Sequence, residues 1–124
     1  MTINQKNALK PWLNEPDELA WTDKVTGLKC LILRHELGHL CGYVQSDLTD
    51  IDSFDVHGGI TFRGRFQYAA GLWLGFDCAH AGDLIPELSV RANDAIYRTL
   101  EYVTRQVEKL ALQVSKHNEA KAKQ

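Results

Sequence analysis

Two short segments of the chain combine histidine, aspartate and glycine in a way suited to binding a small polar molecule. They contain His57, Gly58, Gly59 and Thr61 in the first, and Asp77, His80 and Asp83 in the second. Consecutive glycines let a backbone approach a ligand closely, and residues three apart share one face of a helical turn. We therefore predict a polar hollow around four residues called the polar cluster below: His57, Asp77, His80 and Asp83. The alternative is that the aspartates cap turns and the histidine donates to a backbone carbonyl.

A second candidate is the sequence His35-Glu36-Leu37-Gly38-His39, which matches the zinc-binding pattern H-E-x-x-H. On a helix, two histidines four residues apart can hold zinc while the glutamate serves as general base. The flanks are β-branched or contain glycine, and Gln45 stands where the extended zinc-protease pattern has a third histidine. We therefore predict a hairpin turn. A metal-dependent hydrolase, through His35, Glu36 and His39 or through the polar cluster, stays as an alternative.

Histidine and cysteine also pair at a spacing of two, as His39-x-Cys41 and Cys78-x-His80. Residues two apart on a strand point to the same face, so two such strands could form a Cys2His2 zinc site. The separations differ from those of a zinc finger, and buried free cysteine is common in cores. Together with Cys30 the cysteines are odd in number, so we expect reduced thiols in a cytoplasmic protein.

A small sheet is expected to position these residues. Apolar or alternating stretches predict strands at residues 30–33, 39–44, 56–62 and 72–76. The first two are joined by about four residues that include glycine, which is typical of a hairpin. Glu18–Trp21 is a short element whose type the pattern leaves open. The acidic loop between Val44 and Val56 lacks the glycine and final glutamate of a calcium-binding EF-hand.

The C-terminal third has the clearest pattern, because its apolar residues recur at alternating steps of four and three. They are Ile96, Leu100, Val103, Val107, Leu110 and Val114. Asn93 and Asp94 are suited to the start of such a helix. The expected organisation is a flexible N-terminus (1–13), a single α+β domain (14–116) with a small, mainly antiparallel sheet packed against the long helix, and a flexible tail (117–124).

The composition of the 124 residues narrows the class of protein. Hydrophobic residues make up 44% and charged residues 24% of the chain, which is typical of a folded globular domain. No apolar run approaches the roughly 20 residues of a membrane-spanning helix, and the polar start does not resemble a signal peptide. The formal net charge of −2 provides no general basic field, so we expect neither a membrane nor a nucleic-acid partner.

Four stretches of the chain resemble a family of small uncharacterised bacteriophage and bacterial proteins. They are residues 31–44 with C-G-Y-V at the end, V-H-G-G-I-T at 56–61, G-F-D-C-A-H-A-G-D at 75–83, and residues 97–103. The family brings no established activity with it. The resemblance implies that Arg34, Tyr43 and the polar cluster belong to one site. Its bacteriophage setting implies counter-defence, as with small proteins that sequester nucleotide immune signals, and for a phage-encoded chain the expected location is the host cytoplasm.

The leading hypothesis is a binding module for a small polar or nucleotide-like ligand, such as a counter-defence sponge for a nucleotide-derived immune signal. The predicted ligand-binding residues are Arg34, Tyr43, His57, Gly58, Gly59, Thr61, Trp73, Asp77, His80 and Asp83. Arginine offers paired donors to phosphate or carboxylate, and aromatic rings offer a stacking face. The alternatives are the metal-dependent hydrolase and a protein–protein inhibitor. The sequence leaves the ligand's identity, any cofactor and the oligomeric state open.

Overall fold

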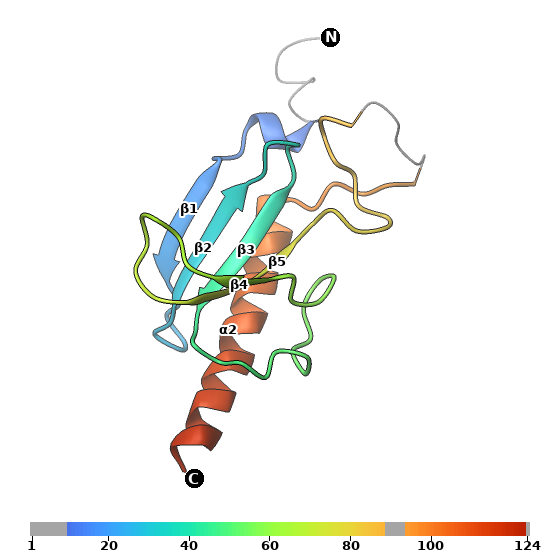
Figure 1. Ribbon diagram of the computed structural model, residues 1–124. Coiled ribbons are helices and arrows are strands. Elements are labelled where there is room, and N and C mark those ends of the chain that lie inside the picture. Colours follow the sequence, from blue (N-terminus) through green and yellow to red (C-terminus); the bar gives the residue numbers. More distant parts are fainter. Residues whose placement is uncertain (1–9, 89–93, 124) are drawn as a thin grey trace.

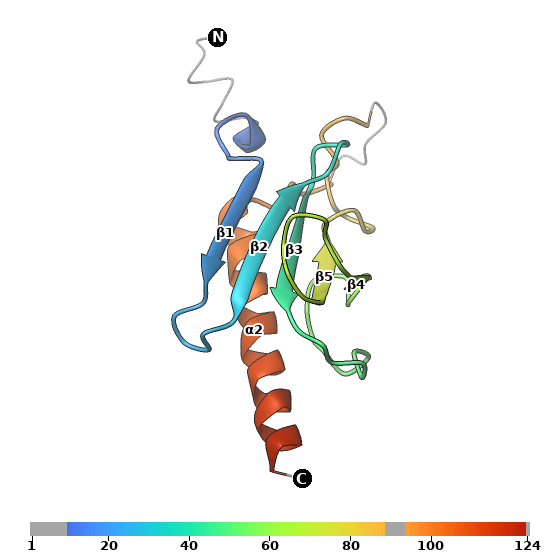
Figure 2. The same cartoon turned by 60° about the vertical axis from the view of Figure 1, so that its left-hand side comes forward.

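The computed structural model describes residues 10–88 and 94–123, which form a five-stranded antiparallel sheet packed against one long helix (Figures 1 and 2). The elements are the 3-10 helix η1 (Pro11–Leu13), β1 (Glu18–Thr22), β2 (Lys29–Arg34), β3 (Leu40–Gln45), β4 (Phe62–Gly64), β5 (Trp73–Asp77) and α2 (Leu100–Ala122). This arrangement confirms the predicted α+β fold. No helix among the described residues is long and apolar enough to cross a membrane.

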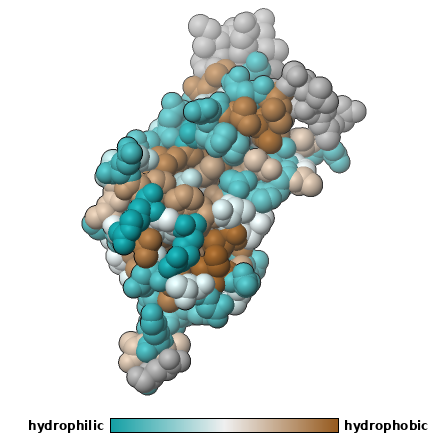
Figure 3. All heavy atoms as spheres, viewed as in Figure 1, coloured by the Kyte–Doolittle hydropathy of each residue, from teal (hydrophilic) through white to brown (hydrophobic). Residues whose placement is uncertain are grey.

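The sheet has one face covered by α2 and one face that we call the open face. Its strands lie in the order β1-β2-β3-β5-β4, so β1 and β4 are the edges. Side chains alternate between the faces, and Ile32, Val44 and Phe76 join the core beneath α2. Leu31 and Tyr43 point to the open face, which the chain between β4 and β5 crosses (Figure 1). Hydrophilic and hydrophobic side chains mix on the surface seen from this side (Figure 3).

Helix α2 begins at Leu100, later than the apolar stripe predicts, because its first turn is capped there. The Thr99 hydroxyl accepts from the Tyr102 N–H at 3.2 Å, and the Glu15 carboxylate accepts from the Leu100 N–H at 2.7 Å. These acceptors satisfy N–H groups that have no partner within the helix. Ile96 is 56% exposed and forms a parallel bridge with Asp83. It is therefore not part of the helical stripe.

The rest of the stripe packs on the sheet as predicted. Its fully buried members are Val103, Val107, Leu110 and Val114. Helix α2 continues to Ala122, through most of the tail predicted at 117–124. The His117 ring contacts the buried Phe54 ring, with centres 4.8 Å apart, and this contact ties the added turns to the core. Asn93 lies outside the described residues, and Asp94 lies before the helix in a turn.

The strand predicted at residues 56–62 is also wrong. Gly58 and Gly59 have φ angles of +70° and +78°, a left-handed conformation that ends extended structure. Val56 is buried in the core and Ile60 packs against it, so the alternating pattern reflects the burial of a turn. In this part of the chain, the strand that pairs with β5 begins at Phe62 and ends at Gly64. The element that the sequence leaves open, at residues 18–22, is the edge strand β1.

Candidate functional site

The H-E-x-x-H sequence forms the hairpin turn between β2 and β3, which confirms the predicted turn. The His35 N–H donates to the His39 carbonyl at 2.8 Å, and the Gly38 N–H donates to the His35 carbonyl at 2.9 Å. Gly38 has a φ of +100°, which favours glycine. Within residues 10–88 and 94–123, no three His, Cys, Asp or Glu side chains are grouped to hold a metal ion. Neither zinc arrangement considered above is assembled there.

Asp83 is the centre of a buried hydrogen-bond network. Its side chain is fully buried. Oδ2 accepts from His57 Nε2 at 2.8 Å and from the His80 N–H at 3.0 Å, and Oδ1 accepts from Arg98 Nε at 2.8 Å. Burial alone would raise the pKa of Asp83, but the bonds from His57, Arg98 and His80 outweigh it, and the pKa is lowered. Asp83 is therefore an ionised, fully bonded carboxylate at neutral pH.

His57 connects this carboxylate to α2. Because a carboxylate only accepts, His57 donates to Asp83 from Nε2. In the tautomer with its proton on Nε2, the ring accepts a hydrogen bond at Nδ1 from the Tyr102 hydroxyl, 2.8 Å away. The His57 backbone N–H donates to Gln106 Oε1 at 2.9 Å. Arg98 lies 5.0 Å from the centre of the Tyr102 ring, in cation–π contact. We call His57, Asp83, Arg98 and Tyr102, with the His80 N–H, the buried network.

The remaining members of the polar cluster lie beside this network. Asp77 accepts from the Thr61 hydroxyl at 2.8 Å and from the Ala79 N–H at 3.0 Å. His80 Nε2 lies 3.2 Å from Asp77 Oδ1, but the ring N–H is not aligned for a hydrogen bond. A Cβ on Gly58 would lie 2.2 Å from this same nitrogen, so the turn needs glycine there. The four residues of the polar cluster thus lie close together through hydrogen bonds and close packing, but of these four only Asp77 lines the hollow described next, which is therefore not the hollow predicted around all four.

Asp77 opens onto a hollow of about 410 Å³, which we call the histidine hollow. It is lined by His35, Leu37, His39, Cys41, Tyr43, Thr61, Phe62, Phe76, Asp77 and Ala79. Three of the predicted ligand-binding residues, Tyr43, Thr61 and Asp77, are therefore in its wall. His57 and Asp83 are not among these lining residues. They are bonded to each other, and Asp83 accepts from the His80 N–H, which holds the turn that carries His80. The volume is in the range of small-molecule sites.

His39 adds an unusual feature to this wall. It is only 4% exposed, and its Nδ1 has no hydrogen-bond partner among the described residues. Burial, followed by repulsion from His35, lowers the pKa of His39, so its ring is neutral at neutral pH. The His35 and His39 rings stack with their centres 4.5 Å apart. Buried polar groups are nearly always bonded, so this unpartnered nitrogen is an exception, and the atom is itself buried rather than exposed to the hollow.

Arg34 has a different role from the one that the resemblance implies. Its acceptors are Asp17 for Nε, the Gly38 carbonyl and Tyr97 hydroxyl for Nη1, and Glu15 and the Pro16 carbonyl for Nη2. A guanidinium has five N–H donors, and all five are engaged. Arg34 therefore joins the chain before β1, the β2–β3 turn and the chain before α2, and it has no donor left for a ligand.

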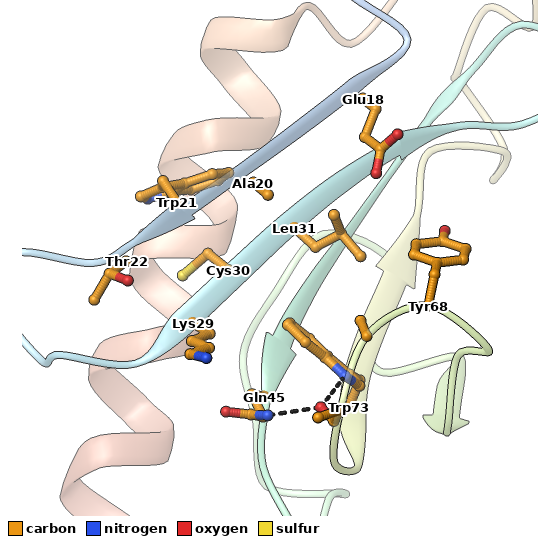
Figure 4. A pocket seen from close by; sticks show the side chains of 12 residues that line it. Glu18, Ala20, Trp21, Thr22, Lys29, Cys30, Leu31, Gln45, Tyr68 and Trp73 are labelled. Atoms are coloured by element: carbon orange, nitrogen blue, oxygen red, sulfur yellow. Dashed lines mark hydrogen bonds between the residues drawn. The ribbon is translucent and has the colours of Figure 1, made fainter.

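Trp73 and Gly59 also lie apart from the histidine hollow. The Trp73 indole N–H donates to the Ala70 carbonyl at 3.1 Å, and the ring lines a second hollow of about 480 Å³ above β1 and β2 (Figure 4). We call it the sheet-face hollow. A Cβ on Gly59 would meet open space, so this glycine serves the turn conformation and contacts no other part of the site.

The three cysteines are free and buried. Burial raises the pKa of Cys30 to about 12 and that of Cys41 to about 11, and it raises the pKa of Cys78 as well. These groups stay as neutral thiols at neutral pH, so they are weak nucleophiles and weak metal ligands. Cys41 contributes to the histidine hollow as a small apolar surface.

Five residues of these networks are not among the site residues that the sequence predicts. They are Glu15, Tyr97, Arg98, Tyr102 and Gln106. A partial signal was present, because Tyr102 and Gln106 are four apart and must share one face of the predicted helix. Tyr97, Arg98 and Tyr102 also lie within residues 97–103, one of the four stretches singled out in the sequence.

Neither protein-family models, nor curated proteins, nor solved structures match this chain. The function of this protein is therefore inferred from the geometry of the site.

Proposed function

We propose that this protein binds a small polar ligand in the histidine hollow. The observation that carries the proposal is the convergence of Thr61, Asp77 and Tyr43 around one hollow that His35 and His39 also line. The Asp77 carboxylate is 28% exposed and held by two hydrogen bonds, so a ligand donor would meet an oriented acceptor. Pre-orientation of this kind lowers the entropy lost on binding.

The wall favours a ligand that donates hydrogen bonds. Asp77 can only accept. His35 Nδ1 already accepts from the Leu37 N–H at 3.1 Å, so its ring offers a ligand a donor at Nε2. Phe62 and Tyr43 add aromatic surface for an apolar or planar part of the ligand. No lysine or arginine is among the described residues that line the hollow. Hydroxyl or amino groups beside a planar ring therefore fit better than a bare phosphate.

A nucleotide-derived immune signal is the specific ligand that the family resemblance implies, and we keep counter-defence sequestration as the finer form of the proposal. Ribose hydroxyls would suit Asp77, and a base would suit the aromatic surface. Phosphates of such a ligand would extend beyond the lining residues, because no cation is placed to receive them there.

The test is a titration of isotope-labelled protein with adenosine, 2′,3′-dideoxyadenosine and adenosine monophosphate, followed by amide NMR. We expect adenosine to shift the Tyr43, Thr61 and Asp77 signals, and expect the dideoxy compound to bind about tenfold more weakly because the acceptor is left unpaired. Asp77→Ala should abolish the difference between the two nucleosides. The exposed Asp55→Ala is the matched control.

The outcome that contradicts the proposal is an absence of shifts in the hollow with all three compounds, or identical binding by the wild type and Asp77→Ala. The same samples also test the hydrolase alternative. New product signals that appear with the wild type and vanish with Asp77→Ala would show that the site converts the ligand instead of only binding it.

A further inference from the structure

The edge strand β1 presents backbone groups to which no described segment is bonded. The Arg34 N–H donates to the Asp17 carbonyl, and the Asp23 N–H donates to the Leu28 carbonyl. Asp17 and Asp23 are therefore hydrogen-bonded positions of the ladder between β1 and β2, and such positions alternate. The outward N–H and carbonyl groups belong to Glu18, Ala20 and Thr22.

The two edges of the sheet differ in how they are protected. Natural proteins guard edges with short strands, charges, proline or bulges. The edge strand β4 has three residues, with Arg63 at its centre and Gly64 at its end. Strand β1 is longer, with five residues, and its central residue is the small, exposed Ala20. The centre of β1 is thus open to pairing.

The sheet-face hollow lies directly beside this open edge (Figure 4). The outward-facing Ala20 lies at one side of the hollow, and its neighbour across the ladder, Leu31, is in the wall. The far wall is Tyr68 and Trp73. The loop that carries Tyr68 is fixed, because the Ala70 carbonyl accepts from Trp73 and from Gln45 Nε2 at 2.7 Å. The hollow is therefore formed before any partner arrives.

Opposite charges flank the hollow along the strand direction. Glu18 lies one row from Ala20 on one side, and Thr22, which pairs with Lys29, lies one row away on the other. All of these side chains except Ala20 are polar, and Figure 4 shows Glu18 and Lys29 at opposite ends of the hollow. An added strand would thus meet an acid, a small apolar gap and a base in turn.

We propose that β1 accepts an extended segment of another protein as a sixth strand, with an aromatic or large apolar side chain of that segment in the sheet-face hollow. A basic side chain two residues away meets Glu18, and an acidic one on the other side meets Lys29. Backbone pairing supplies affinity, and alternate side chains supply specificity. A second copy of β1 would bring Ala20, which is too small to fill the hollow, so a different protein is the better occupant.

The probe is the capped heptapeptide Thr-Asp-Thr-Phe-Thr-Lys-Thr, titrated to 1 mM into labelled full-length protein. We expect the amide signals of Glu18, Ala20 and Thr22 to shift and their hydrogen exchange to slow at least about fivefold, because they gain partners. A peptide with Ala in place of Phe should bind at least about fivefold more weakly. Asp77 lines the histidine hollow and not the sheet-face hollow, so its amide signal should be unaffected. Tyr43 is not used as a reference, because it pairs with Leu31 in the wall of the sheet-face hollow.

Two variants make the test specific. Ala20→Pro removes one outward N–H without removing a bond to β2, and proline is tolerated on an edge strand. This change should weaken binding of the peptide at least about fivefold. Glu18→Lys should weaken binding of this peptide and strengthen binding of a peptide that carries Asp in both charged positions. This exchange of preference keeps the proposal testable even if the proline variant does not fold.

The proposal is overturned if β1 amides do not respond to 1 mM peptide, or if Glu18→Lys leaves the preference between the two peptides unchanged. Shifts of the β1 amides that depend on protein concentration without peptide would assign the edge to a second copy of this chain, and would likewise overturn it. Shifts in the histidine hollow instead of β1 would show that the peptide binds elsewhere.

Discussion

The change Asp83→Asn tests whether the buried network holds the site together. The asparagine has the shape of the aspartate but replaces one oxygen by an NH2 donor. Its remaining oxygen can take the place of Oδ2, which accepts from His57 and from the His80 N–H. The NH2 group then faces the Arg98 Nε donor, where the carboxylate accepts at 2.8 Å.

The magnitude follows from this geometry. A hydrogen bond to a charged group contributes about 1.5–3 kcal/mol. The Arg98 side chain is 23% exposed, so water can satisfy part of what its Nε donor loses. We therefore expect Asp83→Asn to lower the free energy of unfolding by about 1.5–3 kcal/mol. A domain of this size retains about 5–15 kcal/mol, so the variant should still fold without denaturant.

The assay is equilibrium unfolding in urea, followed by tryptophan fluorescence and circular dichroism. Asp55→Asn is the matched control, because Asp55 is 84% exposed and pairs with Lys109 on the surface. That change should alter the free energy of unfolding by less than about 1 kcal/mol. If Asp83→Asn were within about 1 kcal/mol of the wild type, the reasoning about the buried network would be refuted.

Three further predictions concern stability. Leu110→Ala should cost about 2–5 kcal/mol because the side chain is fully buried under the sheet, whereas the half-exposed Leu112→Ala should cost much less; urea midpoints compare them. Gly58→Ala should lower the melting temperature more than Gly59→Ala, since both have positive φ but only the first Cβ would strike another side chain. Because the pKa of Asp83 is lowered on folding, its contribution to stability is complete above the unfolded value of 3.8 and is lost as pH falls through the folded pKa. A plot of the free energy of unfolding against pH should therefore be flatter below pH 3.8 for Asp83→Asn than for the wild type.

The sequence predicted those parts of the fold that depend on local periodicity. The apolar runs of β2, β3 and β5 and the buried stripe of α2 each repeat with the period of their element. The start of α2 was missed because its caps include Glu15, a residue 85 positions away. The strand predicted at 56–62 fails for a related reason, since a buried turn with Val56 and Ile60 inside mimics the alternation of a strand.

The proximity of the four polar-cluster residues was predictable because they stand at turns beside strand ends, but the sequence did not show that of these four only Asp77 lines the histidine hollow. The role of Arg34 was not predictable, because its acceptors come from residues 15–17, 38 and 97. A sequence shows that an arginine is present, whereas only the fold shows that all five donors are used. Trp73 was likewise assigned to the site by residue type, although it faces the sheet-face hollow.

The central claim, that the histidine hollow holds a small polar ligand through Asp77, is tested most directly by native mass spectrometry. Wild type, Asp77→Ala and Asp55→Ala are incubated in parallel with the same small-molecule extract of bacterial cells, desalted and measured under gentle ionisation. We predict an added mass on the wild type and on Asp55→Ala that is absent from Asp77→Ala. The same added masses on all three proteins, or none on any of them, would contradict the claim.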